Sequence, residues 1–229
     1  IVCGALGREV KDIVRHHGWD VIVSGVAPAD HLYPHRIAPD VEKRIGALRP
    51  RCERLLVVFG DCGTQGKLDK MLSEHGIARI KGPNCYEMYA GDLYPKLLAK
   101  ELGTFFLTDF LVRTFRRAVI GGLGLDRFPQ LKEDFFHNCR RVVYLIQKED
   151  PALRREARAI ADFLGLPLAI HITGYGALEK RLKAWMEQTP EIPKQQEQQS
   201  TTVRETMEME TVPGSDRPGK EVWIGQETP

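Results

Sequence analysis

Three cysteines are the residues best placed for chemistry in this sequence of 229 residues. Cys3, Cys62 and Cys85 each occur in a loop that follows a short apolar run. In an open α/β sheet, ligands bind outside the carboxyl ends of the strands, because loop backbones and helix N-termini point there. We therefore expect the three thiols to meet at one edge of such a sheet.

Three converging thiolates would restrict the metal that they hold. They leave one coordination position open, which suits a catalytic zinc ion or an iron–sulfur cluster with one iron free for substrate. Because all three predicted ligands are sulfur, we prefer an iron–sulfur cluster to zinc. The sequence has no C-x-x-C pair, and free cysteines also occur often as small buried apolar residues.

Polar residues and glycines in the same set of loops are candidates for binding a cofactor. The glycines let the backbone approach a ligand closely, and an acidic or hydroxyl side chain could cap the next helix or orient a thiolate. We also expect a thiolate at a helix N-terminus to have a lowered pKa. The predicted cofactor-binding residues are Gly60, Asp61, Gly63, Thr64, Gly174 and Tyr175.

Three side chains are candidates for proton transfer. His31 lies in a loop after an apolar run and could serve as a metal ligand or a proton carrier. Glu87 follows Cys85 by two residues and could act as a general acid or base. Asp109 ends another apolar run. His31 also has a simpler interpretation as an exposed loop histidine, and Glu87 as a residue on a solvated helix face.

Two other functions remain open. In the first, Cys62 is the nucleophile of a metal-free transferase that accepts a methyl or acyl group, while His31 or Glu87 moves the proton. In the second, the protein is a non-catalytic accessory or chaperone protein that holds a cofactor or a partner enzyme.

The composition excludes several classes of protein. A net charge of +2 gives no strong field toward nucleic acid or an acidic membrane. No apolar run approaches the ~20 residues that span a bilayer, and no export signal opens the sequence. Five cysteines, an odd number, argue against a disulfide framework. We expect a cytoplasmic protein with reduced thiols and a small-molecule or cofactor ligand.

The elements that must position these residues alternate along the chain. Short runs rich in β-branched and aromatic residues predict parallel strands that are covered on both faces. The predicted strands are 20–26, 54–60, 104–108, 141–147 and 166–173, with weaker candidates at 1–3 and 77–80. Because 1–3 is short for a strand, we expect that the beginning of that strand is missing.

Helix patterns separate the strands. Asp150 and Pro151 supply an N-cap and a first-turn proline, an apolar stripe follows, and Gly165 ends the helix. Such alternation predicts right-handed crossovers and a three-layer, doubly wound α/β fold with one mostly parallel sheet of about six or seven strands. We expect a single domain over residues 1–189. Residues 190–229, which are rich in Gln, Glu, Thr and Pro, predict a disordered polar tail.

Seven short motifs together resemble a bacterial and archaeal family, the domain of unknown function 1638 family. The resemblance runs from Ile1 to about Glu187 and is specific as a set. It implies a cytoplasmic protein associated with corrinoid-dependent methyl transfer, with a methyltransferase or a corrinoid protein as partner, and it implies no assigned activity. The motifs are Cys3 to Leu6, Pro28 to Ile37, Gly60 to Thr64, Cys85 to Glu87, Gly103 to Phe110, Gly124 to Asp126 and Thr173 to Gly176.

Overall fold

The computed structural model describes residues 1–188, so the predicted tail over 190–229 lies outside the described residues. Strands and helices alternate along this part of the chain. The strands are β1 (Val2–Cys3), β2 (Gly25–Val26), β3 (Leu56–Val57), β4 (Ala78–Arg79), β5 (Thr104–Thr108), β6 (Arg141–Ile146) and β7 (Leu168–Ile172).

The helices separate or follow these strands. The α-helices are α1 (Gly7–His17), α2 (Ile37–Leu48), α3 (Lys67–Glu74), α4 (Cys85–Ala90), α5 (Leu93–Lys100), α6 (Asp109–Phe115), α7 (Leu131–Phe136), α8 (Pro151–Leu164) and α9 (Gly176–Glu187). The shorter helices are η1 (Gly4–Leu6), η2 (Pro28–Leu32), η3 (Pro34–Arg36), η4 (Arg49–Arg51) and the π-helix η5 (Arg116–Gly121). No helix within residues 1–188 is long and apolar enough to cross a membrane.

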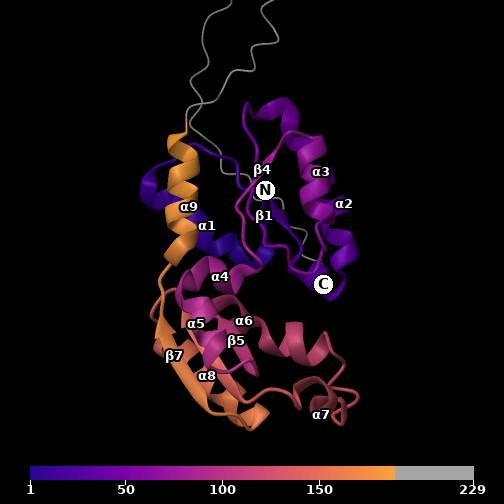
Figure 1. Cartoon of the computed structure of the whole chain (residues 1–229), viewed down its shortest axis with the longest axis vertical. Coiled ribbons are helices and arrows are strands. Elements are labelled where there is room, and N and C mark those ends of the chain that lie inside the picture. Colours follow the sequence, from indigo (N-terminus) through magenta and orange to yellow (C-terminus); the bar gives the residue numbers. More distant parts are fainter. Residues whose placement is uncertain (189–229) are drawn as a thin grey trace, which may run out of the picture.

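Two short parallel pairs form the first half of the structure. Strand β1 pairs with β2, and β3 pairs with β4. A parallel bridge between Val2 and Val58 joins the two pairs, so the strand order is β2-β1-β3-β4. Figure 1 shows α1 and α9 on one side of these strands and α2 and α3 on the other. We call these four strands and four helices the first lobe.

A separate three-stranded parallel sheet forms the second half. Its order is β5-β6-β7, and Phe106 pairs with Val143. Residues of β6 alternate between two apolar clusters: Val142, Tyr144 and Ile146 pack with α6 and α8, and Val143 and Leu145 pack with α5. We call β5–β7 and α5–α8 the second lobe, and α4 lies between the two lobes (Figure 1).

The α/β alternation and the parallel strands are as predicted, but the single doubly wound sheet is wrong. The seven described strands form a three-stranded sheet and two two-stranded sheets, which only the isolated bridge between Val2 and Val58 joins. After β4, the chain enters α4 and α5, whose apolar residues cover one face of β5 and β6. Strand β5 then pairs with β6 and not with β4.

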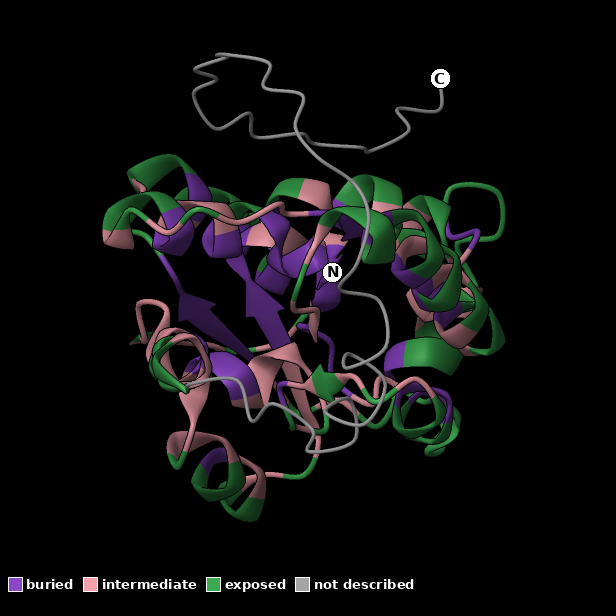
Figure 2. Cartoon of the chain, turned by 90° about the horizontal axis from the view of Figure 1, so that it is seen from above, coloured by how far each residue is buried: buried purple, intermediate pink, exposed green. Residues whose placement is uncertain are grey.

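Helix α8 forms where the sequence predicted it, for the expected physical reasons. The Asp150 carboxylate accepts hydrogen bonds from the backbone N–H groups of Ala152 and Leu153, and Pro151 is the first helical residue. Gly165 ends the helix in the left-handed conformation, at φ +72°. The buried stripe runs from Leu153 to Leu164. In Figure 2, buried residues lie on several of the strands and on the inner sides of the helices, whereas β4 and β7 have no buried residue.

The chain returns to the first lobe through Gly176, the first residue of α9. Its φ is +54°, and a Cβ atom placed there would lie 1.8 Å from the carbonyl oxygen of Tyr89. A side chain at this position would therefore push α9 away from α4. Gly165 also has a positive φ, but a Cβ atom there would meet nothing within 4 Å.

These two glycines give a matched pair of substitutions. Gly176→Ala should lower the free energy of unfolding by more than about 3 kcal/mol, because it combines backbone strain with overlap against backbone. Gly165→Ala should cost only about 1 to 2 kcal/mol, from the backbone conformation alone. Urea denaturation followed by circular dichroism measures both values. Equal losses would mean that Gly176 is not in close contact with α4.

Candidate functional site

The loops after β1, β3 and β4 bring Cys3, Cys62 and Cys85 into one region. Cys3 ends β1, and its N–H donates to the Val58 carbonyl of the next strand at 3.0 Å. The Cys62 N–H donates to the Pro83 carbonyl at 3.0 Å, which ties its loop to the loop before Cys85. Burial, followed by negative charge on Cys85 or Cys62, raises the pKa of Cys3, and charge on Cys62 raises the pKa of Cys85, so the three sulfur atoms lie within electrostatic range of one another.

A glycine permits this close approach of two loops. A Cβ atom on Gly60 would lie 2.7 Å from the Asn84 Cα atom and 3.0 Å from the Cys62 sulfur. Cys62 itself has a left-handed backbone, with φ +47°. Gly60 was predicted to allow a ligand to approach the backbone closely. In the structure, the loop that contains Asn84 occupies this place.

His31 lies beside Cys3. Its Nδ1 atom donates a hydrogen bond to the Pro28 carbonyl at 2.9 Å, because that carbonyl can only accept. Its Nε2 atom lies 3.8 Å from the Cys3 sulfur. Burial lowers the pKa of His31, which favours the neutral ring. The unprotonated Nε2 atom therefore faces the Cys3 thiol.

The environment of the cysteines keeps their thiols protonated. Burial, followed by the charge of Asp61, raises the pKa of Cys62 to about 11. Burial and the neighbouring Cys62 raise the pKa of Cys85 to about 12. The expectation of a lowered pKa at Cys62 is therefore wrong for the metal-free protein. Cys62 does not start a helix, since α3 begins five residues later at Lys67.

Two buried polar groups next to the cysteines were missed by the sequence analysis. Among residues 1–188, the Glu9 Oε2 atom and the Tyr89 hydroxyl are buried and make no hydrogen bond of standard geometry, but the two groups lie close enough to influence each other's pKa. Burial and the charges of Glu9, Cys85 and Cys3 raise the pKa of Tyr89. Glu9 lies on the apolar face of α1, between Leu6 and Ile13. An acidic residue within an apolar stripe is the signal that could have identified it.

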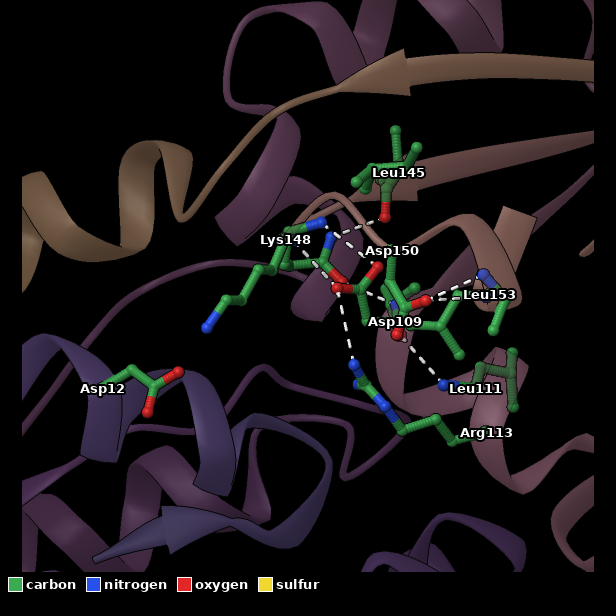
Figure 3. A network of polar contacts seen from close by, with 12 residues as sticks. Asp12, Asp109, Leu111, Arg113, Leu145, Lys148, Asp150 and Leu153 are labelled. Atoms are coloured by element: carbon green, nitrogen blue, oxygen red, sulfur yellow. Dashed lines mark hydrogen bonds and ion pairs between the residues drawn. The ribbon is translucent and has the colours of Figure 1, made fainter.

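Asp109 fastens the ends of β5 and β6 together (Figure 3). Its Oδ1 atom accepts from the Tyr144 hydroxyl at 2.7 Å and from the Gln147 N–H at 3.2 Å. Its Oδ2 atom accepts from the Lys148 N–H at 2.9 Å and lies 4.0 Å from an Arg113 nitrogen. Both carboxylate oxygens are thus engaged within the second lobe. The predicted catalytic role of Asp109 finds no support in this geometry.

Glu87 is also engaged in a structural contact. Arg181 of α9 donates to both of its carboxylate oxygens, with 2.7 Å between Arg181 Nη1 and Glu87 Oε2. The Glu87 N–H donates to the side chain of Asn84, the N-cap of α4. The ion pair therefore joins α4 to α9. A role of Glu87 in proton transfer, which was predicted from its spacing to Cys85, would require this pair to open.

The other predicted loop residues have defined contacts. The Asp61 carboxylate accepts from the Thr64 hydroxyl at 2.7 Å and from the Gly66 N–H at 3.1 Å, and these bonds lower the pKa of Asp61. Asp61 and Thr64 thus close their own loop, with Gly63 at φ +85° between them. Gly174 has φ +56°, and the Tyr175 hydroxyl donates to Asp12 of α1 at 3.0 Å. Their roles in cofactor binding stay predictions.

The three sulfur atoms are not arranged for a single bound ion. Ligands of one tetrahedral zinc ion with Zn–S bonds of ~2.3 Å lie about 3.8 Å apart. Within residues 1–188, the one group of three or more His, Cys, Asp and Glu ligand atoms that all lie within 4.8 Å of one another is His16, His17 and Glu179. The cysteines are therefore close, but more widely spaced than ligands of one ion.

Comparisons with known proteins give one match. A family model described as "Protein of unknown function (DUF1638)" matches residues 26–182. The matched residues include His31, Cys62 and Cys85 and do not include Cys3. No curated protein and no solved structure matches the chain.

A substitution at Asp109 tests its structural role. Asp109→Asn should lower the free energy of unfolding by about 2 to 3 kcal/mol, because the amide NH₂ group would face a donor and leave it without a partner. Asp162→Asn, on the exposed side of α8, should change it by less than about 0.5 kcal/mol. Urea denaturation compares the two variants. If they are equally stable, the network around Asp109 does not hold the second lobe together.

The thiol pKa values can be tested by alkylation. In metal-free protein, the rate of iodoacetamide labelling at Cys62 should keep rising with pH up to about 11, because only the thiolate reacts. Mass spectrometry of peptides locates the labelled residue, and urea-unfolded protein serves as the reference with ordinary thiol pKa values. A plateau below pH 8 at Cys62 would instead identify an activated nucleophile.

Proposed function

The chain belongs to the family described as protein of unknown function DUF1638, and we propose that it is a metal-binding protein whose site is formed by Cys3, Cys62 and Cys85. The preferred metal group is an iron–sulfur cluster, and zinc is the alternative. The observation that carries the proposal is the grouping of the buried Cys3 thiol and the partly buried Cys62 and Cys85 thiols near the neutral ring of His31, whose Nε2 atom lies 3.8 Å from the Cys3 sulfur.

Electrostatics supports a cation at this position. Burial raises the pKa of each of the three thiols, and negative charge on one cysteine raises the pKa of another. The metal-free site therefore disfavours thiolates. A bound metal reverses this effect, because its positive charge stabilises every coordinating thiolate at once. The same raised pKa values give no support to a metal-free transferase that uses Cys62 as its nucleophile.

The spacing of the ligands favours a cluster over a single ion. Cysteines that hold an iron–sulfur cluster bind different iron atoms, so their sulfur atoms lie farther apart than ligands of one zinc ion. The sulfur atoms of Cys3, Cys62 and Cys85 do not all lie within 4.8 Å of one another. At least one of the sulfur-to-sulfur distances is therefore longer than in a site for one zinc ion, as it would be around a cluster.

His31 is suited to the remaining coordination position. Metal-binding histidines usually donate their other ring nitrogen to a carbonyl or carboxylate, which fixes the ring and its tautomer. The hydrogen bond from His31 Nδ1 to the Pro28 carbonyl, at 2.9 Å, is of this kind. The ring also stacks on Phe59, with 5.7 Å between the ring centroids. His31 would thus bind the group or lie beside its open position.

Glu9 and Tyr89 would supply polar contacts at the site. When bound, a cluster held by three cysteines offers one iron to a substrate. The Oε2 atom of Glu9 and the hydroxyl of Tyr89 are buried near the cysteines and, within residues 1–188, make no hydrogen bond of standard geometry. Burial raises the pKa of Glu9, so its carboxyl group could hold a proton for transfer to a ligand. We further propose a role in one-carbon transfer with a corrinoid protein or methyltransferase, which rests on the family resemblance.

Metal and sulfide analysis tests the proposal. Protein purified without oxygen should contain iron together with acid-labile sulfide, or about one zinc ion per chain if the alternative holds. The triple variant Cys3→Ser/Cys62→Ser/Cys85→Ser should lose that metal, because serine is a poor ligand for these metals.

The two remaining cysteines provide the control. Cys52→Ser/Cys139→Ser should keep the full metal content, because both thiols are absent from the predicted ligand set. Equal metal content in the triple variant and in the wild type would refute the cysteine site. Absence of bound metal from the anaerobic wild type, even after incubation with iron and sulfide or with zinc, would refute it as well.

A further inference from the structure

A second group of metal-ligating side chains lies on the surface of the first lobe, where α1 and α9 meet. It contains His16 and His17 at the end of α1 and Glu179 in the first turn of α9. One ligand atom of each residue lies within 4.8 Å of the other two. From this geometry we infer that His16, His17 and Glu179 form a binding site for a divalent transition metal such as zinc, which clamps α9 to α1.

The ligand set fits such an ion. Two imidazole nitrogens and one carboxylate oxygen are the ligands of many zinc sites that keep a fourth position for water. With metal–ligand bonds of ~2.0–2.1 Å, tetrahedral ligands lie about 3.4 Å apart. His17 Nε2 already lies 2.9 Å from Glu179 Oε1, so only side-chain adjustments are needed to admit the ion.

The fold holds the two histidines in place. His17 is the last residue of α1, and Gly18 ends the helix in the left-handed conformation at φ +63°. The Trp19 ring then stacks on the His17 ring, with 4.6 Å between centroids and an angle of 12° between the planes. The His16 ring meets the His17 ring edge-on at 5.0 Å. Such support restricts the rotamers of a ligand before the ion binds.

The ion would connect distant parts of the chain. His17 and Glu179 are separated by 162 residues, and α9 is the helix by which the chain returns to the first lobe. The Arg181–Glu87 ion pair and the hydrogen bond from Tyr175 to Asp12 hold the same helix. Metal binding would stabilise the folded chain by mass action, because the ligands are brought together only by folding. This site does not depend on the proposed cysteine site.

Cobalt(II) and zinc(II) titrations of the full chain test the inference. Isothermal titration calorimetry and thermal unfolding measure binding. His17→Ala and Glu179→Gln should each weaken binding at this site by at least about tenfold and reduce the metal-induced rise in Tm. His75→Ala is the matched control, since His75 and Glu42 form a similar pair at 3.1 Å that belongs to no described three-ligand group.

Cobalt absorption separates this site from the cysteines. Cobalt bound by thiolates gives charge-transfer bands in the near ultraviolet, whereas a histidine and carboxylate site does not. Binding without these bands, retained in the triple Cys→Ser variant and lost in both His17→Ala and Glu179→Gln, supports the inference. Unchanged binding in either folded variant, or an equal loss in His75→Ala, overturns it. Circular dichroism verifies that each variant is folded.

Discussion

Strand β1 is only two residues long, yet it hydrogen-bonds on both of its sides and thereby holds the first lobe together. The Val2 N–H donates to the Ser24 carbonyl beside β2, and the Cys3 N–H donates to the Val58 carbonyl after β3. The bridge between Val2 and Val58 is thus the link between two pairs of strands that would otherwise be separate. It also determines the position of Cys3, because the N–H group that hydrogen-bonds to the Val58 carbonyl is that of Cys3. The neighbourhood of Cys3, Cys62 and Cys85 follows from this pairing.

In the region between the lobes, ionisable side chains lie in buried positions, where a charge is unfavourable unless it has partners. The helix η1 that follows β1 contacts α6, which follows β5, so polar groups from both lobes meet there. Asp109 is satisfied by donors from the end of β6, whereas Glu9 and Tyr89 have buried atoms that make no hydrogen bond of standard geometry with any residue in 1–188. Uncompensated polar groups of this kind are costly in a folded protein and are concentrated at functional sites. Asp109 is therefore a structural carboxylate, whereas Glu9 and Tyr89 are polar groups near the cysteines that are not fully satisfied.

Local patterns in the sequence predicted the order and type of the elements, but the predicted strands 20–26 and 54–60 are only two residues long, as β2 and β3. The way in which the strands assemble into sheets was predicted poorly. Helix α8 and strand β5 could be located because capping residues, apolar spacing and β-branched runs act over a few neighbouring residues. The division of the strands into separate sheets could not be predicted, since both halves of the sequence show the same alternation of strand and helix. Of the three cysteines predicted in loops, Cys62 lies in one, whereas Cys3 is the last residue of β1 and Cys85 the first of α4. The partner of Glu87 was not predicted, because Arg181 lies 94 residues away in the chain. Gly60 illustrates the same limit, as its spacing suggested a ligand whereas the structure places Asn84 there.

The return of α9 to the first lobe has a consequence for how the protein is made. The helix covers the first lobe from the far end of the described chain, and its Leu178 and Leu182 are part of the apolar cluster that contains Val2 and Ile13. During synthesis on the ribosome, β1–β4 therefore emerge long before the helix that completes their packing. The second lobe lies between them in the sequence, and its own contacts are more local, so it can fold while the first lobe is still incomplete. Completion of the first lobe must wait until about residue 187 has been synthesised, and until then the surface that α9 later covers is exposed to chaperones and to other nascent chains.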